Sequence, residues 1–154
     1  MAEIDLLRRD VLVASPQMGL PGKKQALFSD SFVVIARKGH PAVKKGKLTI
    51  EQLKTLPMVQ LKLGSNKNQV DQLFRDFDFD PNLVTVSVNE ISLVPLMVSE
   101  TDNIGFVQER FANRLKEVLG IQIVETDLPH LTLIESVHYH PTKSHDPAIA
   151  WLVK

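Results

Sequence analysis

Three histidines near the C-terminus have the spacing of possible metal ligands. His138 and His140 are two residues apart, a spacing that on a strand puts both side chains on one face, and His145 is close behind. Three imidazole nitrogens can hold zinc and leave one coordination position open. We favour the competing interpretation, in which these are surface and interface histidines before a turn at Pro141. We therefore expect no metal and no cofactor.

A second cluster of potential ligands is acidic. Asp76, Asp78 and Asp80 alternate like the first ligands of a calcium-binding loop. Such a loop needs glycine at its sixth position and glutamate at its twelfth, where this chain has Pro81 and Ser87. The aspartates are therefore interpreted as a solvated helix end.

Catalytic and targeting motifs are missing from the sequence. It contains no nucleophile elbow, zinc-protease motif, phosphate-binding loop or dinucleotide fingerprint, so we expect a protein that is not an enzyme. The chain has no cysteine, which agrees with a cytoplasmic location, and its N-terminus lacks the apolar core of a signal peptide. Lys and Arg number 18, as do Asp and Glu, so no basic excess favours nucleic acid.

The apolar patterns predict strands that alternate with helices. Strands are expected over residues 11–14 (buried), 32–36, 58–61, 83–88, 104–107, 121–124 and 131–138. One helix is expected to end within residues 4–9, and another to begin within residues 89–92. Further helices are expected over 49–56, in a segment containing 70–77, and over 108–119 and 147–153. Residues 15–24 and 40–47 read as loops. In the 108–119 helix, Phe111, Leu115 and Val118 would point inward. The order indicates an α/β sandwich with a largely parallel sheet.

Four segments in this order resemble the effector-binding domain of LysR-type transcriptional regulators. They are FVVIARKGHP (32–41), LTIEQLKTLP (48–57), SLVPLMVSETDNIGFVQERFA (92–112) and DPAIAWL (146–152). The first two are similar to that family's crossover into its second lobe. The last is similar to its final helix, where a Trp-Leu pair packs onto the first lobe. The resemblance covers nearly the whole chain from Asp10 onward.

The resemblance implies a periplasmic-binding-protein-like (type II) two-lobed α/β sandwich whose first lobe is incomplete. Residues 36–125 would form the second effector-binding lobe, and residues 1–35 with 126–154 a remnant of the first. Family members begin with a winged helix-turn-helix, a linker helix and the first strands of lobe one. We find no counterpart of these, so DNA would be bound only through a helix-turn-helix domain absent from this chain.

In a fold of this kind a small molecule lies between the lobes, near the carboxyl ends of strands and helix N-termini. Candidate effector-binding residues follow predicted strand ends or precede predicted helices, and they are Ser15, Pro16, Gln17, Ser65, Asn66, Asn89, Ser92, Gly105 and Phe106. Helix capping is an equal alternative for Ser65, Asn66, Asn89 and Ser92. Core packing is the more frequent role for a lone aromatic such as Phe106.

The implied function is effector sensing by a bacterial transcriptional regulator, with an organic, aromatic or carboxylic inducer that modulates DNA binding by the full-length protein. The alternative is a solute-binding or small-molecule-binding α/β domain of a transporter or an enzyme. No membrane partner is expected. An incomplete first lobe would leave a sheet edge unpaired, so we expect self-association as a homodimer or tetramer, or else a rearrangement of the N-terminal segment.

Overall fold

The computed structural model describes residues 9–15, 19–62 and 69–153. The chain divides into two compact units. Unit 1 consists of residues 1–30 and 132–154, and unit 2 of residues 31–131. The strand β2 (Lys23–Arg37) contributes to both, whereas β8 (Leu131–Tyr139) lies almost wholly in unit 1. The expected helix end at Ile4–Arg9 falls, apart from Arg9, outside the described residues.

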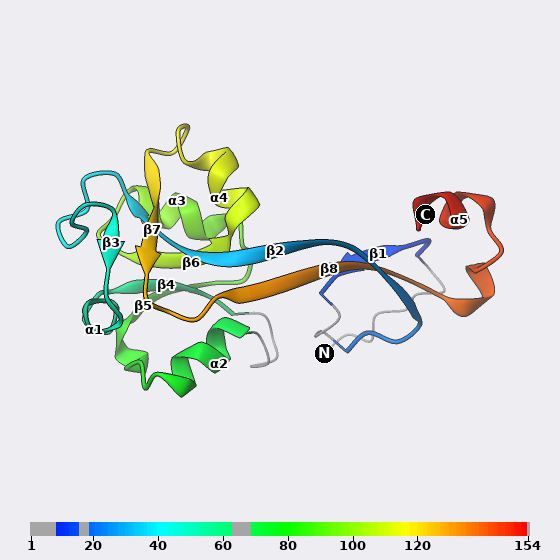
Figure 1. The fold of residues 1–154 in the computed structure, drawn as a ribbon, viewed down its shortest axis with the longest axis horizontal. Coiled ribbons are helices and arrows are strands. Elements are labelled where there is room, and N and C mark those ends of the chain that lie inside the picture. Colours follow the sequence, from blue (N-terminus) through cyan, green and yellow to red (C-terminus); the bar gives the residue numbers. More distant parts are fainter. Residues whose placement is uncertain (1–8, 16–18, 63–68, 154) are drawn as a thin grey trace. The chain divides into compact units, whose positions relative to one another are not determined.

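Unit 2 is built on a mixed β-sheet (Figure 1). Its order runs β2, β6 (Ile104–Gln108), β4 (Met58–Leu61) and β5 (Val84–Val88). On the other side of β2 lies β7 (Ile121–Thr126), which pairs with the short β3 (Lys47–Leu48). Its helices are α1 (Ile50–Leu53), α2 (Gln69–Asp76), the 3-10 turn η2 (Pro81–Leu83), α3 (Leu93–Ser99) and α4 (Glu109–Leu115).

The strand pairing corrects the expectation of a largely parallel sheet. β4 is parallel to β5 and β6, and β3 is parallel to β7. β2 is antiparallel to both β6 and β7. The chain passes from unit 1 into unit 2 along β2 and goes back along β8. β2 is therefore not joined to β6 or β7 by a helical crossover, the connection that neighbouring parallel strands need.

Alternating side chains divide the core of unit 2 into two layers. Val34 and Ala36 face the layer that contains Leu53 of α1 and Leu73 of α2. Ile35, between them, faces the layer built by α3 and α4. Figure 1 shows the two helix pairs on opposite sides of these strands. A strand with both faces covered has to be apolar at every position, which explains the continuous run that predicted it.

Local capping chemistry determines where several elements begin and end. Thr49 Oγ1 accepts a hydrogen bond from Gln52 N, and Gln52 Oε1 accepts one from Thr49 N, which completes a capping box at α1. Pro95 lies in the first turn of α3, where its missing N–H is not needed. Gly120 has a φ of 62°, a conformation that favours glycine after a helix.

Unit 1 contains β1 (Leu12–Ala14), β8, the 3-10 turn η3 (Pro141–Lys143) and α5 (Pro147–Leu152). β1 is antiparallel to β8, and the other neighbour of β8 is β2. Only Ala14 of β1 is buried, so a short strand was predicted correctly but its burial was not.

The packing of α5 differs from the expectation. Ile149 is the buried residue of this helix, whereas Trp151 is 77% exposed and Leu152 is 39% exposed. The Trp-Leu pair is therefore not the anchor that the resemblance implied. Asp146 caps α5 through hydrogen bonds from Ala148 N and Ile149 N, which orients the helix with Ile149 inward.

Two further boundaries differ from prediction. β2 begins at Lys23, nine residues before the expected Phe32. The prediction missed this start because Lys23–Ser29 is exposed and its apolar run, Ala26–Phe28, is too short to mark a buried strand. α4 ends at Leu115, and Val118, expected to be buried, is 80% exposed. Ala112 takes the inward position, and the chain past Leu115 turns toward Gly120.

Candidate functional site

The carboxyl ends of three parallel strands lie at one edge of unit 2. β4 and β5 pair from Met58–Val84 to Leu61–Val88, and Lys62 N continues this contact by donating to Val88 O at 2.7 Å. β4 and β6 pair only at Met58–Ile104 and Val59–Gly105. The ladder between β4 and β6 therefore stops before their carboxyl ends.

The connections that leave these two carboxyl ends run to opposite faces of the sheet. The chain after β4 leads to α2, which packs in one core layer, and the chain after β6 leads to α4, which packs in the other. This is a topological switch point, the usual place of ligand binding in open α/β sheets. The polar residues at the two strand ends are Gln60, Lys62 and Gln108.

These three residues differ in how they are held. Gln60 Nε2 donates to Asp71 Oδ1 of α2 at 2.7 Å, which fixes the amide beside the strand end. Lys62 is exposed and supplies a positive charge. Gln108 precedes α4 as its N-cap without a side-chain capping bond. Sequence analysis missed all three. Lys62 and Gln108 directly follow the predicted strands 58–61 and 104–107 and could have been found by that position, whereas Gln60 lies inside the first of these strands.

Two of the predicted site residues lie at the same edge. Asn89 follows Val88, whose carbonyl binds Lys62 N, and its side chain is exposed. Ser92 is the N-cap of α3, has helical backbone angles and makes no side-chain capping bond. The capping alternative considered for Ser92 therefore does not describe its hydroxyl in this structure.

Gly105 lies within the sheet and is surrounded by protein. A Cβ at this position would be 2.6 Å from Val94 Cγ1 and 3.1 Å from Val98 Cγ2, both on α3. The residue thus allows α3 to approach the backbone of β6 closely.

Phe106 also lies in the core, on the opposite face of β6. Its ring makes an edge contact with Phe74 of α2 at a centroid distance of 5.5 Å, and Phe74 in turn stacks on Phe79 at 4.9 Å. Only 7% of Phe106 is exposed. In this structure the aromatic face is used by neighbouring side chains of the same unit.

The remaining predicted residues are only partly covered by the structure. Ser15 follows β1 in unit 1, is half-buried and makes a polar interaction. Pro16, Gln17, Ser65 and Asn66 lie outside the described residues.

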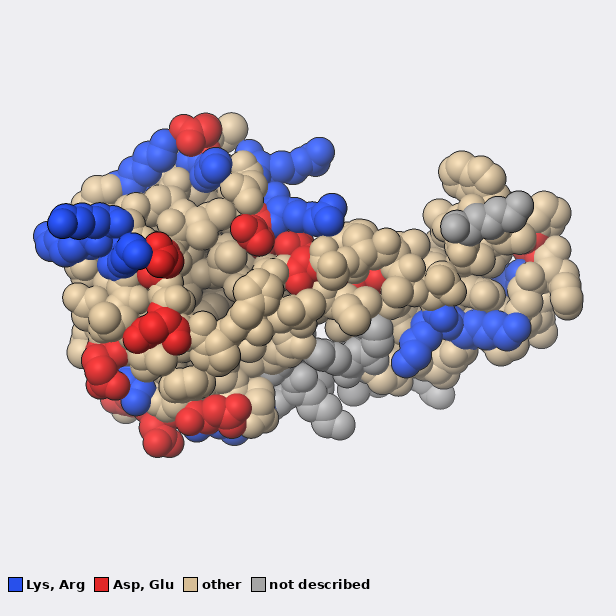
Figure 2. Space-filling model, viewed as in Figure 1, with Lys and Arg blue, Asp and Glu red and all other residues tan. Residues whose placement is uncertain are grey.

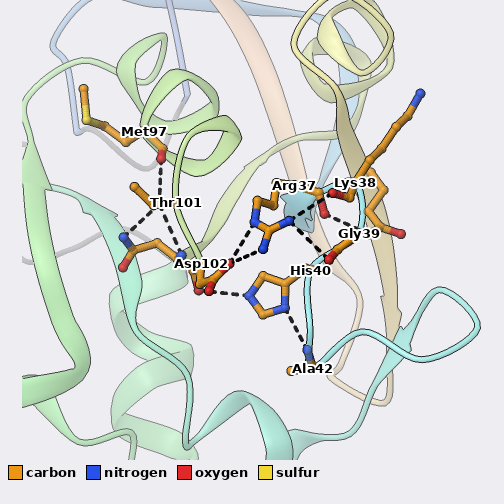
Figure 3. Close-up of polar contacts among 10 residues, drawn as sticks. Arg37, Lys38, Gly39, His40, Ala42, Met97, Thr101 and Asp102 are labelled. Carbon is orange, nitrogen blue, oxygen red and sulfur yellow. Dashed lines mark hydrogen bonds and ion pairs between the residues drawn. The ribbon is translucent and has the colours of Figure 1, made fainter.

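A polar cluster joins the end of β2 to the turn after α3 (Figure 3). Arg37 Nε donates to Asp102 Oδ1 at 2.8 Å, and its other nitrogens contact the same oxygen and the carbonyls of Lys38 and Gly39. His40, which is 3% exposed, bonds through Nε2 to the Asp102 carbonyl at 2.9 Å and accepts from Ala42 N through Nδ1. His40, at the start of the predicted loop 40–47, is therefore buried and joins that loop to the turn after α3.

The C-terminal histidines do not converge. His138 is 1% exposed, with Nε2 at 3.3 Å from the Ala14 carbonyl, whereas His140 caps η3 through Thr142 N. Within the part of the chain that the structure describes, no three His, Cys, Asp or Glu residues are grouped for a metal. Asp80, from the calcium-like sequence, caps η2.

Electrostatic interactions shift two carboxyl groups. Burial raises the pKa of Glu135 on β8, and the nearby Asp30 raises it further. The hydrogen bond from Lys38 lowers the pKa of the exposed Glu117.

Figure 2 shows Lys and Arg side chains gathered over the turn that precedes β3. Lys47, the first residue of β3, pairs with Glu125 at 2.8 Å.

No described helix has both the length and the apolar character needed to cross a membrane.

Comparison with known proteins relates almost the whole chain to one family. The model of the LysR substrate binding domain matches residues 6–154. Nodulation protein D 2 of Rhizobium tropici is 26% identical over 152 residues, which cover 96% of this chain and 48% of that protein. The HTH-type transcriptional regulator SyrM of Rhizobium etli is 26% identical over 150 residues, covering 94% of this chain and 43% of that protein. This chain thus spans about half the length of the curated relatives it matches.

The fold is similar to that of solved regulatory domains. The regulatory domain of CcmR from Synechocystis, solved in complex with 2-PG, superimposes with a TM-score of 0.73 at 17% identity. The match covers 96% of this chain and 73% of that one. The fold is the type II periplasmic-binding-protein-like α/β fold predicted from the sequence. The matched family is one of regulatory rather than catalytic domains, in agreement with the expectation that the chain is not an enzyme.

Proposed function

Because the chain belongs to the LysR substrate-binding domain family, we propose that it senses a small organic effector for a bacterial transcriptional regulator. The single observation that best supports effector binding is the switch point of unit 2, where the ladder between β4 and β6 stops at Val59–Gly105. The solved complex of the CcmR regulatory domain with 2-PG is a precedent on the same fold.

The residues at this edge favour an effector with a carboxylate. Lys62 offers an exposed ammonium group, and Asn89, Ser92 and Gln108 offer amide and hydroxyl groups that can donate hydrogen bonds. When one charged donor and several neutral donors surround a carboxylate, its lone pairs all accept hydrogen bonds and its negative charge is paired with a positive one. Ser15 of unit 1 remains a proposed additional contact, as do Pro16, Gln17, Ser65 and Asn66.

The proposed mechanism is a population shift. An effector changes the protein only to the extent that it binds one conformation better than another. In the whole regulator such a shift would alter how a homo-oligomer holds operator DNA through a helix-turn-helix domain, and no bond is made or broken. We propose that residues 36–125 form one effector-binding lobe and that residues 1–35 with 126–154 belong to the other.

A thermal-shift screen with benzoate, salicylate, phthalate and citrate tests this function. We expect at least one carboxylate to raise the unfolding temperature of the wild-type chain, because a ligand that binds only the folded state stabilises it. Lys62→Ala should remove most of this shift, whereas the control Lys54→Ala, on the C-cap of α1, should retain it. No shift with any carboxylate, or equal shifts in both variants, would contradict the proposed carboxylate site.

A further inference from the structure

A tight hairpin turn comes directly before β3. Lys47 N donates to Lys44 O at 3.1 Å, and the two residues form an isolated antiparallel bridge. The residues between them both have positive φ angles, 53° at Lys45 and 75° at Gly46. A two-residue hairpin turn with positive φ at both central positions is of type I′, which favours asparagine, aspartate or glycine at the first of them. Here that position holds a lysine.

Lysine is an unfavourable residue for this conformation. The left-handed region brings its Cβ close to the following carbonyl oxygen, so lysine is less stable there than glycine or asparagine. The surroundings nevertheless hold the turn in place, because Glu125 N donates to Gly46 O at 2.9 Å and β3 pairs with β7 just beyond it. Backbone strain of this kind gathers at functional sites. A role in folding does not account for a lysine at position 45.

The turn also carries two positive charges that are not paired. Lys44 and Lys45 are exposed, and neither forms an ion pair with another residue in the part of the chain that the structure describes. Lys47 is exposed as well, and it pairs with Glu125. Figure 2 shows the turn as a group of basic side chains. Neighbouring cations repel each other, and an anion that contacts both of them removes this repulsion.

Nearby acidic side chains limit how long such an anion can be. Glu125 lies opposite Lys47 in the register between β3 and β7, and Asp127 accepts a hydrogen bond from Ile50 N at 2.7 Å. Glu51 is exposed in the first turn of α1. A nucleic-acid backbone carries closely spaced phosphates over a long path and would meet these carboxylates beyond the turn. The chain has 18 basic and 18 acidic residues, so it lacks the basic excess that typically holds such a backbone.

We propose that the turn Lys44–Lys47 is a docking surface for a short acidic segment of a partner protein, with a few successive Asp or Glu residues. Lysine ammonium groups are point charges on flexible stems, so they can reach successive carboxylates without one fixed geometry. Contacts of this kind raise the association rate and select the partner more than they add affinity. The surface goes beyond the proposed function, because the effector site lies at the carboxyl ends of β4, β5 and β6.

Fluorescence anisotropy with a synthetic peptide tests this surface. The probe is a fluorescein-labelled peptide with alternating Asp and Glu residues, and its control has Asn and Gln at the same positions. The acidic peptide alone should bind saturably at low salt, and added salt should release it. Lys44→Ser/Lys45→Asn should weaken binding about fivefold or more. Lys23→Ser/Lys24→Asn removes the same charge from exposed residues of β2 and should change binding less than about twofold.

The single variant Lys45→Asn separates docking from a structural role. Because asparagine tolerates the left-handed conformation better than lysine, Lys45→Asn should raise the urea midpoint of unfolding while it weakens peptide binding. Lys45→Arg keeps the charge and should keep the binding.

Three results would overturn the docking surface. They are equal binding of the acidic and neutral peptides, equal losses in the two double variants, and a duplex oligonucleotide that binds at Lys44 and Lys45 more tightly than the peptide. None of them bears on the effector site, which the Lys62→Ala variant tests separately.

Discussion

Gly105 illustrates how a single residue can be predicted as a site and serve as packing. It lies on β6, below α3, where the approach of Val94 and Val98 leaves no space for a side chain. From sequence, a glycine at a strand end is equally compatible with a ligand and with a close helix. Only the position of α3 distinguishes the two.

Gly105→Ala should destabilise the chain by about 1–3 kcal/mol, because the new methyl group overlaps Val94 Cγ1. Urea denaturation measures the change in unfolding free energy. The double variant Gly105→Ala/Val94→Ala removes the overlapping methyl groups and should show a smaller loss than the sum of the two single variants. Strictly additive losses would contradict the packing role.

Glu135 is a residue whose effect on stability depends on pH. Its pKa is raised in the folded state by burial and by Asp30, so the folded chain holds this proton more tightly than the unfolded chain. The stabilising contribution of the proton is present at acidic pH and is lost as the pH rises through the folded pKa. At neutral pH the ionised carboxylate is therefore a cost to folding.

Glu135→Gln should increase the unfolding free energy at pH 7, and the gain should shrink as the pH falls toward about 4, where carboxyl groups become protonated. Urea denaturation at the two pH values measures both differences. The exposed Glu100→Gln serves as the control and should change little. A gain that is the same at both pH values would rule out the ionisation argument.

At the scale of elements, capping signals were more informative than periodicity. The helix predicted over 49–56 begins where Thr49 acts as its N-cap, and the structure adds a capping box with Gln52. β4 and α2 also follow their apolar patterns. The first half of β2 could not be predicted because its residues do not alternate between buried and exposed, and the apolar run Ala26–Phe28 is too short to indicate a strand.

Thr49→Ala should lower the unfolding free energy by about 1 kcal/mol, because it leaves Gln52 N without its capping oxygen. Thr55→Ala is the matched control, since the Thr55 hydroxyl donates to the Gln52 carbonyl, which also accepts the Thr55 N–H. The loss of unfolding free energy in Thr55→Ala should be smaller than that in Thr49→Ala. Equal losses in chemical denaturation of the two variants would argue against a capping role for Thr49.

At the scale of the whole molecule, the fold class followed from the order of elements, whereas the switch-point site that we propose could be anticipated only in part. Asn89 and Ser92 lie at the shared edge of β4 and β5, as their positions before a helix suggested. Lys62 and Gln108 were missed because the switch point depends on strand order. That order, with β4 between β5 and β6, is set by long-range pairing and has no local signature.

The central claim is that a carboxylate effector binds at the switch point of unit 2. The most direct measurement is a titration of isotope-labelled chain with the carboxylate that gives the largest thermal shift, followed by backbone amide chemical shifts. We predict saturable changes concentrated at Leu61–Lys62, Asn89–Ser92 and Gln108–Arg110. Changes confined to the basic turn before β3, or no saturable change at these three segments, would contradict it.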